Sequence, residues 1–172
     1  MSYCRSCGTK LPGPAPVQCA RCGTWQWLNA KPCSCALVVD GGRLLFVRRG
    51  HEPWRDHWTV PGGFCDQTEH PIAAAERETV EEVGLTVEVT GYLGTWLSPY
   101  EDETIAVAYY HARPLDRVGE PDPAEIAEVS WFAPEDVPEL LAPPDTMPAV
   151  VAAWLEALAD AHTVTPLPDR PR

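Results

Sequence analysis

The stretch that decides the fold reads GGFCDQTEHPIAAAERETVEEVGL and covers residues 62–85. A helix is predicted from about Pro71 to Val83, because proline suits a first helical turn and Gly84 suits the left-handed position after a last one. At 100° per residue, one stripe of this helix is apolar and is expected to face the core. Its members are Ile72, Ala75, Thr79 and Val83.

Three glutamates share the face of this helix that points away from the apolar stripe. Glu78 and Glu82 are four residues apart and stack, with Glu81 beside them. A solvated acidic face is the simplest interpretation, but two neighbours favour a cation site. The glycine pair at 62–63 is predicted to form a tight loop with free carbonyls, and Arg77 can orient a carboxylate through two hydrogen bonds. Mg²⁺ takes carboxylate and carbonyl oxygens together with substrate phosphates.

The same stretch resembles the signature of the Nudix hydrolases, Gly-x5-Glu-x7-Arg-Glu-(apolar)-x-Glu-Glu-x-Gly-(apolar). Eight of the nine fixed positions match: Gly63, Glu69, Arg77, Glu78, Glu81, Glu82, Gly84 and Leu85. Thr79 stands where an apolar residue is usual, and its β-branched shape predicts only a local change in packing. The resemblance implies an α/β fold, a sandwich of a mixed sheet between helices. It also implies an enzyme that hydrolyses a nucleoside diphosphate linked to another group.

The resemblance further implies which residues form the site. Glu78, Glu81 and Glu82 would be the catalytic residues and would hold Mg²⁺ or Mn²⁺, with the carbonyl of Gly62 as a further ligand. Glu69 and Arg77 would orient these ligands. The expected partner is a small nucleotide diphosphate, and a homodimer is suggested by family analogy alone.

Four of the seven cysteines form the pairs Cys4-x-x-Cys7 and Cys19-x-x-Cys22. Two such pairs place four thiolates around one tetrahedral Zn²⁺, and with all four positions taken the site is expected to be structural. Two disulfides or free thiols are the alternatives. Cys33 and Cys35 alternate on a predicted strand and are expected to pack as small apolar residues. Together with Cys65 they have no familiar metal-site spacing, which leaves a second metal site as a minor alternative.

A four-cysteine ribbon before a Nudix domain is similar to the NADH pyrophosphatases. These enzymes also carry a Glu-x-x-Glu-x-x-Trp stretch, which residues 125–131 match, so Glu125 is a further candidate ligand for Mg²⁺ or Mn²⁺. Their Ser-Gln-Pro-Trp-Pro-Phe-Pro-x-Ser substrate motif is absent, because residues 96–104 read WLSPYEDET. Specificity for NAD(H), and removal of NAD caps from RNA, therefore does not follow from the ribbon.

The rest of the chain predicts strands interleaved with helices, which indicates an α/β domain. Strands are expected at 36–39, 43–48, 58–60, 86–93, 104–112 and 128–132, with a helical turn at 134–141 and a helix at 147–160. The predicted domains are a zinc ribbon at 1–31 and a hydrolase domain at 32–161. The proline-rich residues 162–172 are expected to be a disordered tail.

Charge is distributed unevenly. Residues 1–61 hold eight Lys/Arg against three Asp/Glu, whereas residues 62–172 hold five against twenty-two, and the net charge is −12. This balance argues against nonspecific binding of nucleic acid, which needs many cations. No apolar run approaches the roughly 20 residues that span a bilayer, and no signal peptide pattern is present, so no membrane partner and a cytoplasmic location are expected.

Substrate contacts are predicted at arginines that precede the signature and at an aromatic residue that follows it. Arg48 and Arg55 could reach a phosphate, as could Arg49, and Tyr100 or Trp96 could stack a base. A solvated surface and ordinary packing are the alternatives at these positions. The alternative function is a Nudix-fold protein that senses a ligand without catalysis. Such a sensor has no need to retain every glutamate of the signature.

Overall fold

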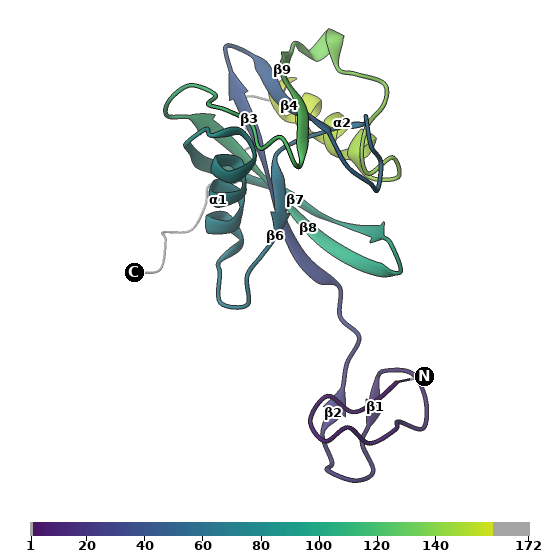
Figure 1. Cartoon of the computed structure of the whole chain (residues 1–172). Coiled ribbons are helices and arrows are strands. Elements are labelled where there is room, and N and C mark those ends of the chain that lie inside the picture. Colours follow the sequence, from purple (N-terminus) through teal and green to yellow (C-terminus); the bar gives the residue numbers. More distant parts are fainter. Residues whose placement is uncertain (1, 160–172) are drawn as a thin grey trace. The chain divides into compact units, whose positions relative to one another are not determined.

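The computed structural model describes residues 2–159 and divides the chain into two compact units, Met1–Ala30 and Lys31–Arg172 (Figure 1). This division falls one residue before the boundary predicted after residue 31. The predicted tail at 162–172 and the predicted domain end at 161 lie outside the described residues. None of the helices in the described part is long and apolar enough to cross a membrane.

The first unit is built from two turns and a small hairpin. Strands β1 (Val17–Gln18) and β2 (Trp25–Gln26) pair antiparallel. Gly8 and Gly23, which directly follow the cysteine pairs, have φ angles of 69° and 72°, and their amides donate to the carbonyls of Cys4 and Cys19. Glycine adopts this left-handed conformation without a steric penalty, which explains its position after each pair.

The second unit contains a seven-stranded mixed sheet. Its order is β5-β4-β3-β8-β7, with β6 paired to β3 and β9 paired to β4. Strands β3 and β8 are parallel and the other pairs are antiparallel. The strands are β3 (Lys31–Asp40), β4 (Arg43–Arg49), β5 (Trp58–Thr59), β6 (Gly62–Phe64), β7 (Val87–Tyr100), β8 (Glu103–Pro114) and β9 (Ile126–Phe132).

Helices α1 (Pro71–Val83) and α2 (Met147–Ala159) cover opposite faces of this sheet (Figure 1). Alternate residues of β3 face opposite sides: Leu37 packs in the cluster that contains α2, whereas Ala36 and Val38 pack in the cluster that contains α1. This alternation is the two-residue period of a strand that is buried on both faces. The predicted α/β sandwich with a mixed sheet is therefore confirmed. The helical turn predicted at 134–141 is a short 3₁₀ helix, η1 (Pro134–Asp136).

Helix α1 has the predicted bounds and the predicted buried stripe. Gly84 has a φ of 62° and its amide donates to the carbonyl of Val80, which ends the helix. Thr79 is fully buried, and its hydroxyl donates to the carbonyl of Ala75 at 2.7 Å. The hydrogen bond satisfies the polar atom that replaces the usual apolar side chain.

Two local predictions are wrong. The glycine pair at 62–63 is not a loop but part of β6, which pairs with Cys35 and Ser34 of β3. Strand β7 continues to Tyr100 instead of ending near residue 93, and it includes Pro99. Since β7 is at the end of the sheet order, proline is tolerated there, because one side of an edge strand needs no backbone donor.

Candidate active site

A cavity of about 460 Å³ opens in the second unit beside the residues that match the Nudix signature. Glu78, Glu82 and Glu125 line it together with aromatic side chains from four other segments. Strand β6 and helix α1 bring the glycines and the glutamates to it, and β9 begins directly after Glu125. The cavity therefore combines an acidic group with an apolar, aromatic surface, which is typical of a ligand site.

The two glycines of β6 leave the space in which the glutamates lie. A Cβ atom at Gly63 would stand 2.5–2.6 Å from the carboxyl group of Glu78. A Cβ atom at Gly62 would overlap the carbonyl oxygen of Ser34 and the Sγ of Cys35. Both positions therefore need glycine for close packing of the strand against α1 and β3, and Gly62 also has a φ of 155°, which other residues rarely adopt.

Arg77 holds three carboxylates at once. Its Nε and Nη2 donate to the two oxygens of Glu69, each at 2.8 Å, and its Nη1 donates to Glu78 at 2.8 Å and to Glu81 at 2.7 Å. A fifth contact joins Nη2 to the carbonyl of Phe64 at 3.1 Å. The bidentate bond lowers the pKa of Glu69 to about 2, so Glu69 stays ionised and fixes the guanidinium. This arrangement fits the orienting role inferred for Glu69 and Arg77.

Glu82 is buried, which the helical wheel did not predict. The wheel placed it away from the apolar stripe, but β6 covers that side of the helix, and Glu82 Oε2 accepts the Gly62 amide at 3.1 Å. Burial, with a smaller contribution from the charges of Glu78 and Glu125, raises the pKa of Glu82 to about 8. The pKa of Glu78 is also raised by burial. Carboxylates packed together at such a cost are typical of functional sites, cation sites among them.

A second hollow, lined by acidic residues alone, adjoins the first through Glu78, Glu82 and Glu125. Glu81 lines it as well, and so does Asp122, which sequence reasoning missed. The Asp122 amide donates to the carbonyl of Glu82 at 2.9 Å, which ties the segment before β9 to the end of α1. No spacing in the sequence signals this contact, because the two segments meet only through the fold. An all-oxygen set of this kind suits Mg²⁺ or Mn²⁺.

The predicted substrate residues separate into two groups. Tyr100 lines the cavity, whereas Arg48 and Arg55 do not. Arg48 pairs with Asp56 at 2.7 Å and with Glu128 at 3.1 Å, and Arg55 is exposed near Glu52. Arg49, the next residue of β4, lines the cavity, because neighbouring side chains of a strand point to opposite faces.

Two tryptophans differ in whether they reach the cavity. Trp96 packs against Tyr109, with ring centroids 5.5 Å apart, and belongs to the partly buried residues around the core. Trp54, which lies in the loop before β5, lines the cavity and was not predicted. Its only sequence signal is an aromatic residue in an otherwise polar loop.

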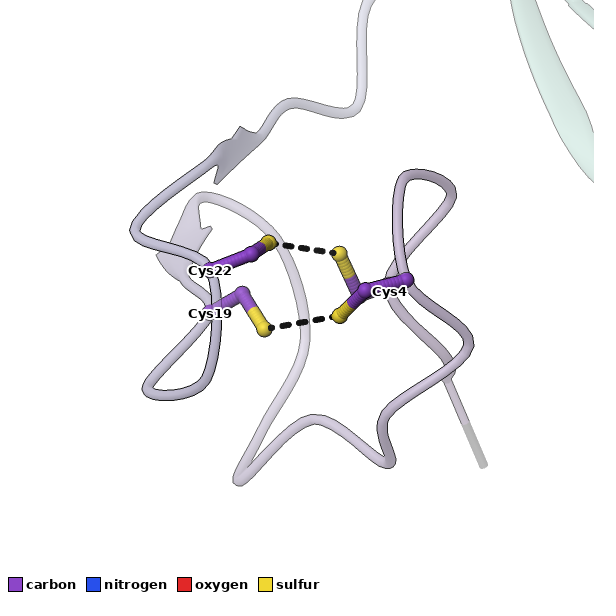
Figure 2. Close-up of side chains that lie close together, drawn as sticks. Cys4, Cys19 and Cys22 are labelled. Atoms are coloured by element: carbon purple, nitrogen blue, oxygen red, sulfur yellow. Dashed lines mark hydrogen bonds between the residues drawn. The ribbon is translucent and has the colours of Figure 1, made fainter.

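The four cysteines of the first unit converge (Figure 2). Sulfur atoms of Cys4 and Cys22 are 3.6 Å apart, as are those of Cys7 and Cys19. Among the described residues, this is the one group of His, Cys, Asp or Glu whose ligand atoms all lie within 4.8 Å of one another.

These sulfur distances argue against disulfides among the four cysteines. A disulfide needs an S–S bond of about 2.05 Å, and all seven cysteines are free. Four sulfurs at about 2.3 Å from a tetrahedral Zn²⁺ would lie roughly 3.8 Å apart, close to the observed 3.6 Å. Hydrogen bonds with Thr9 lower the pKa of Cys7 to about 6, and Thr24 lowers that of Cys22. The cluster therefore fits a zinc ion, with no position left for a water.

The remaining cysteines behave as apolar residues. Cys33 and Cys35 are buried in the cluster that contains α2, as predicted, and burial raises the pKa of Cys33 to about 12. A thiol with such a pKa stays protonated at neutral pH, which makes it a poor metal ligand. Cys65 belongs to no group of convergent metal ligands among the described residues.

The family model described as NUDIX domain matches residues 31–155. Among curated proteins, the MutT-like protein of Streptomyces ambofaciens is 33% identical over 117 residues, which cover 67% of this chain and 71% of that protein. The NAD-capped RNA hydrolase NudC of Deinococcus radiodurans is 29% identical over 146 residues, which cover 80% of this chain and 51% of that protein. The chain thus spans about half the length of that relative.

The fold also has solved counterparts. The crystal structure of a NUDIX hydrolase from Nitrosomonas europaea superposes with a TM-score of 0.76 and 24% sequence identity. The match covers 96% of this chain and 95% of that one. At this identity the likeness concerns the fold alone.

Proposed function

Because the chain belongs to the Nudix hydrolase family, we propose that it hydrolyses the diphosphate bond of a nucleoside diphosphate linked to another group, with Mg²⁺ or Mn²⁺. Substrates of this class include ADP-ribose, NAD(H) and nucleotide sugars. The observation that carries the proposal is the buried Glu82 beside the partly buried Glu78, at a cavity that Glu125 also lines. The name of the NudC relative, an NAD-capped RNA hydrolase, agrees with this class of bond.

The residues proposed to hold the divalent ion are Glu78, Glu81, Glu82, Glu125 and the carbonyl of Gly62. A bound ion of this kind polarises phosphoryl oxygens and makes a bound water more acidic. The all-oxygen donor set fits such an ion, and Gly63 lets the carboxyl group of Glu78 approach the strand closely.

The side chains around these ligands set their orientation. Arg77 fixes one oxygen each of Glu78 and Glu81, and the Gly62 amide fixes Oε2 of Glu82. One of the carboxylates of this group would accept a proton from the attacking water. The aromatic and apolar part of the lining lowers the polarity around the carboxylates, which strengthens each electrostatic contact there.

The test is a panel of NADH, ADP-ribose, diadenosine tetraphosphate, nucleotide sugars and deoxynucleoside triphosphates, assayed with Mg²⁺ or Mn²⁺. Phosphate-containing products are measured for the wild type and for Glu82→Gln. At least one substrate is expected to turn over, and the substitution is expected to lower kcat by about 10²–10⁴-fold, since it removes a charged ligand of the divalent ion. Glu88→Gln, on the exposed part of β7, is the matched control and is expected to behave as wild type.

Two outcomes would contradict the proposal. Turnover by Glu82→Gln equal to that of the wild type would remove Glu82 from the chemistry. Saturable binding of a nucleotide without turnover of any substrate would favour the sensor.

We propose in addition that the four cysteines hold one structural Zn²⁺, supported by the sulfur spacing in the first unit. A homodimer and a cytoplasmic location stay predictions. Sedimentation of the purified chain at several concentrations tests the first of these.

A further inference from the structure

The segment before β9 carries a candidate ligand that no helix or strand holds. The other three candidate glutamates belong to α1, whereas Glu125 lies in a turn that ends where β9 begins. Glu125 nevertheless lines both the cavity and the acidic hollow. Residues 119–125 connect it to the end of α1 and are referred to below as the tether. The contacts of the tether therefore decide whether Glu125 reaches the glutamates of the helix.

The tether is bound to the open end of helix α1. The last carbonyls of an α-helix have no partner within the helix. Here the carbonyl of Val83 accepts the Gly119 amide at 3.0 Å, and the carbonyl of Glu82 accepts the Asp122 amide at 2.9 Å. The two backbones also meet closely, because a Cβ atom at Gly119 would stand 3.1 Å from the carbonyl oxygen of Gly84. The tether is thus fixed to the turn of α1 that carries the buried Glu82.

Asp122 folds the end of the tether into a tight turn. Its Oδ1 accepts the Ala124 amide at 2.8 Å, and its carbonyl accepts the Ile126 amide at 2.8 Å. Asp and Asn side chains both form turns in which they accept the amide two residues further on. From the other side, the Gly50 amide donates to the carbonyl of Glu125 at 2.7 Å. The turn and the end of β4 together hold the backbone that carries Glu125.

Resting on the proposed function, we infer that Asp122 is a positioning residue for the metal-dependent hydrolysis and acts through Glu125. Its amide fixes the tether to Glu82, and its carboxyl group closes the turn that presents Glu125 to the divalent ion. Because Asp122 also lines the acidic hollow, the alternative is that it binds the ion itself. The hydrogen bond from the Ala124 amide favours the positioning role, since it needs an acceptor oxygen at Oδ1 and no charge.

The test compares two substitutions of Asp122. Asp122→Asn keeps an acceptor oxygen and removes the charge, whereas Asp122→Ala removes both. Mn²⁺ binding to the full chain is measured without substrate, from the electron paramagnetic resonance signal of the free ion. Asp122→Ala is expected to weaken it by about 10-fold or more, as loss of an orienting contact around a metal does. Asp122→Asn is expected to bind within about threefold of the wild type, because Asn and Asp are equivalent as local caps.

A double-mutant cycle with Glu125→Gln separates action through Glu125 from a general effect on the fold. If Asp122 serves to place Glu125, its contribution disappears once the Glu125 carboxylate is gone. Asp122→Ala is therefore expected to weaken Mn²⁺ binding of the Glu125→Gln variant by less than about twofold, whereas independent residues would give additive effects.

Two further variants separate the tether from its carboxylates. Gly119→Ala keeps every carboxylate but brings a Cβ atom to 3.1 Å from the Gly84 carbonyl oxygen. It should weaken Mn²⁺ binding by about two- to fivefold, since displacing a ligand by a fraction of an ångström is costly, and it keeps the test decisive if Asp122→Ala fails to fold. Asp116→Ala removes a similar bond, from the Thr86 amide to Oδ1 at 2.9 Å, but lies outside the tether and should bind as the wild type does.

Four results would overturn the inference. Equal loss of Mn²⁺ binding in Asp122→Asn and Asp122→Ala would make Asp122 a ligand, and additive effects with Glu125→Gln would make it independent of Glu125. Unchanged binding in both Asp122→Ala and Gly119→Ala, or no saturable Mn²⁺ binding by the wild type, would leave the tether without this role. The result is independent of the substrate panel. Mn²⁺ binding that depends on the tether supports the inference even if no diphosphate turns over, and turnover with unchanged Mn²⁺ binding in both variants leaves only the proposed function standing.

Discussion

The chain contains two clusters of candidate metal ligands, one of cysteines and one of carboxylates, and they differ in how their ligands are assembled. In the first unit, four cysteine sulfurs from two short turns already lie within 4.8 Å of one another. In the second unit, the carboxylates come from α1 and from the segment before β9, and two of them bond to Arg77. Thiolates complete a tetrahedral zinc site without other ligands. Magnesium keeps waters and substrate phosphates among its ligands, so its protein ligands need only part of the coordination sphere.

This difference teaches what holds each cluster in place. The first unit has a buried cluster of only Cys4, Leu11 and Cys19, too small to stabilise a fold of this length, so the metal is expected to supply the cross-link. The carboxylates of the second unit are instead positioned by a complete sheet and by Arg77, and they are expected to keep their places without an ion. The predictions that follow probe this contrast.

The largest effect is expected in the first unit. Cys19→Ser removes one of four thiolates, and structural zinc sites contribute about 10–16 kcal/mol of apparent binding energy. The purified variant should therefore lose its zinc, about one per chain in the wild type, and residues 2–30 should become sensitive to protease. Elemental analysis and limited proteolysis measure both. Cys65→Ser, outside the cluster, should keep the metal. A folded Cys19→Ser variant with no zinc would show that the metal is dispensable.

The next effect concerns Arg77, which orders the carboxylates of the second unit. Arg77→Lys keeps the charge but cannot make the bidentate bond to Glu69 while also reaching Glu78 and Glu81. Loss of such orientation typically costs 10- to 100-fold in activity, so kcat should fall by about that factor, and the zinc content should stay unchanged. Arg113→Lys, which alters a surface ion pair with Glu88, is the matched control. Kinetics of Arg77→Lys indistinguishable from that control would contradict the role.

Gly63→Ala tests whether the close approach of β6 to the Glu78 carboxyl group helps to position that group. The added Cβ would stand 2.5–2.6 Å from its carboxyl group and must displace it. Since a misplacement of about 1 Å can cost up to 10²-fold in rate, kcat should fall by roughly 10-fold or more while the fold persists. Gly13→Ala, whose Cβ would meet nothing within 4 Å, should be silent. The prediction is wrong if the two variants have equal kcat.

The smallest effect is a pH dependence of stability from Glu69. Arg77 lowers its pKa from 4.5 to about 2, so the folded state binds this proton less readily than the unfolded state does. The pair therefore stabilises fully above pH about 4.5, and its contribution disappears as the pH falls towards 2. Urea unfolding at pH 7 should show Glu69→Gln less stable than wild type by about 1 kcal/mol, and at pH 3 the difference should be smaller. A pH-independent difference would rule out the linkage.

Much of the site could be predicted from the sequence because its parts are close along the chain. Pro71, Gly84 and the stripe between them fix the bounds and the buried face of α1, and the spacing of Glu78, Glu81 and Glu82 follows from the helix. The cysteine pairs are also local. The sequence did not predict features of the site that depend on a contact with a distant segment of the chain. The burial of Glu82 depends on β6, and the choice of Arg49 over Arg48 depends on which face of β4 the cavity adjoins.

The sequence by itself determined the class of chemistry, since the order of glutamates, glycines and cysteines specifies their local geometry in turns and on one helix. The tertiary structure decided the rest. It places the glycine pair in a strand packed against α1, adds Asp122 to the acidic group, and brings Trp54 and Tyr100 to the same cavity. The physical reason is distance along the chain. A helix or turn positions neighbours within a few residues, whereas contacts between distant segments depend on how the whole core packs.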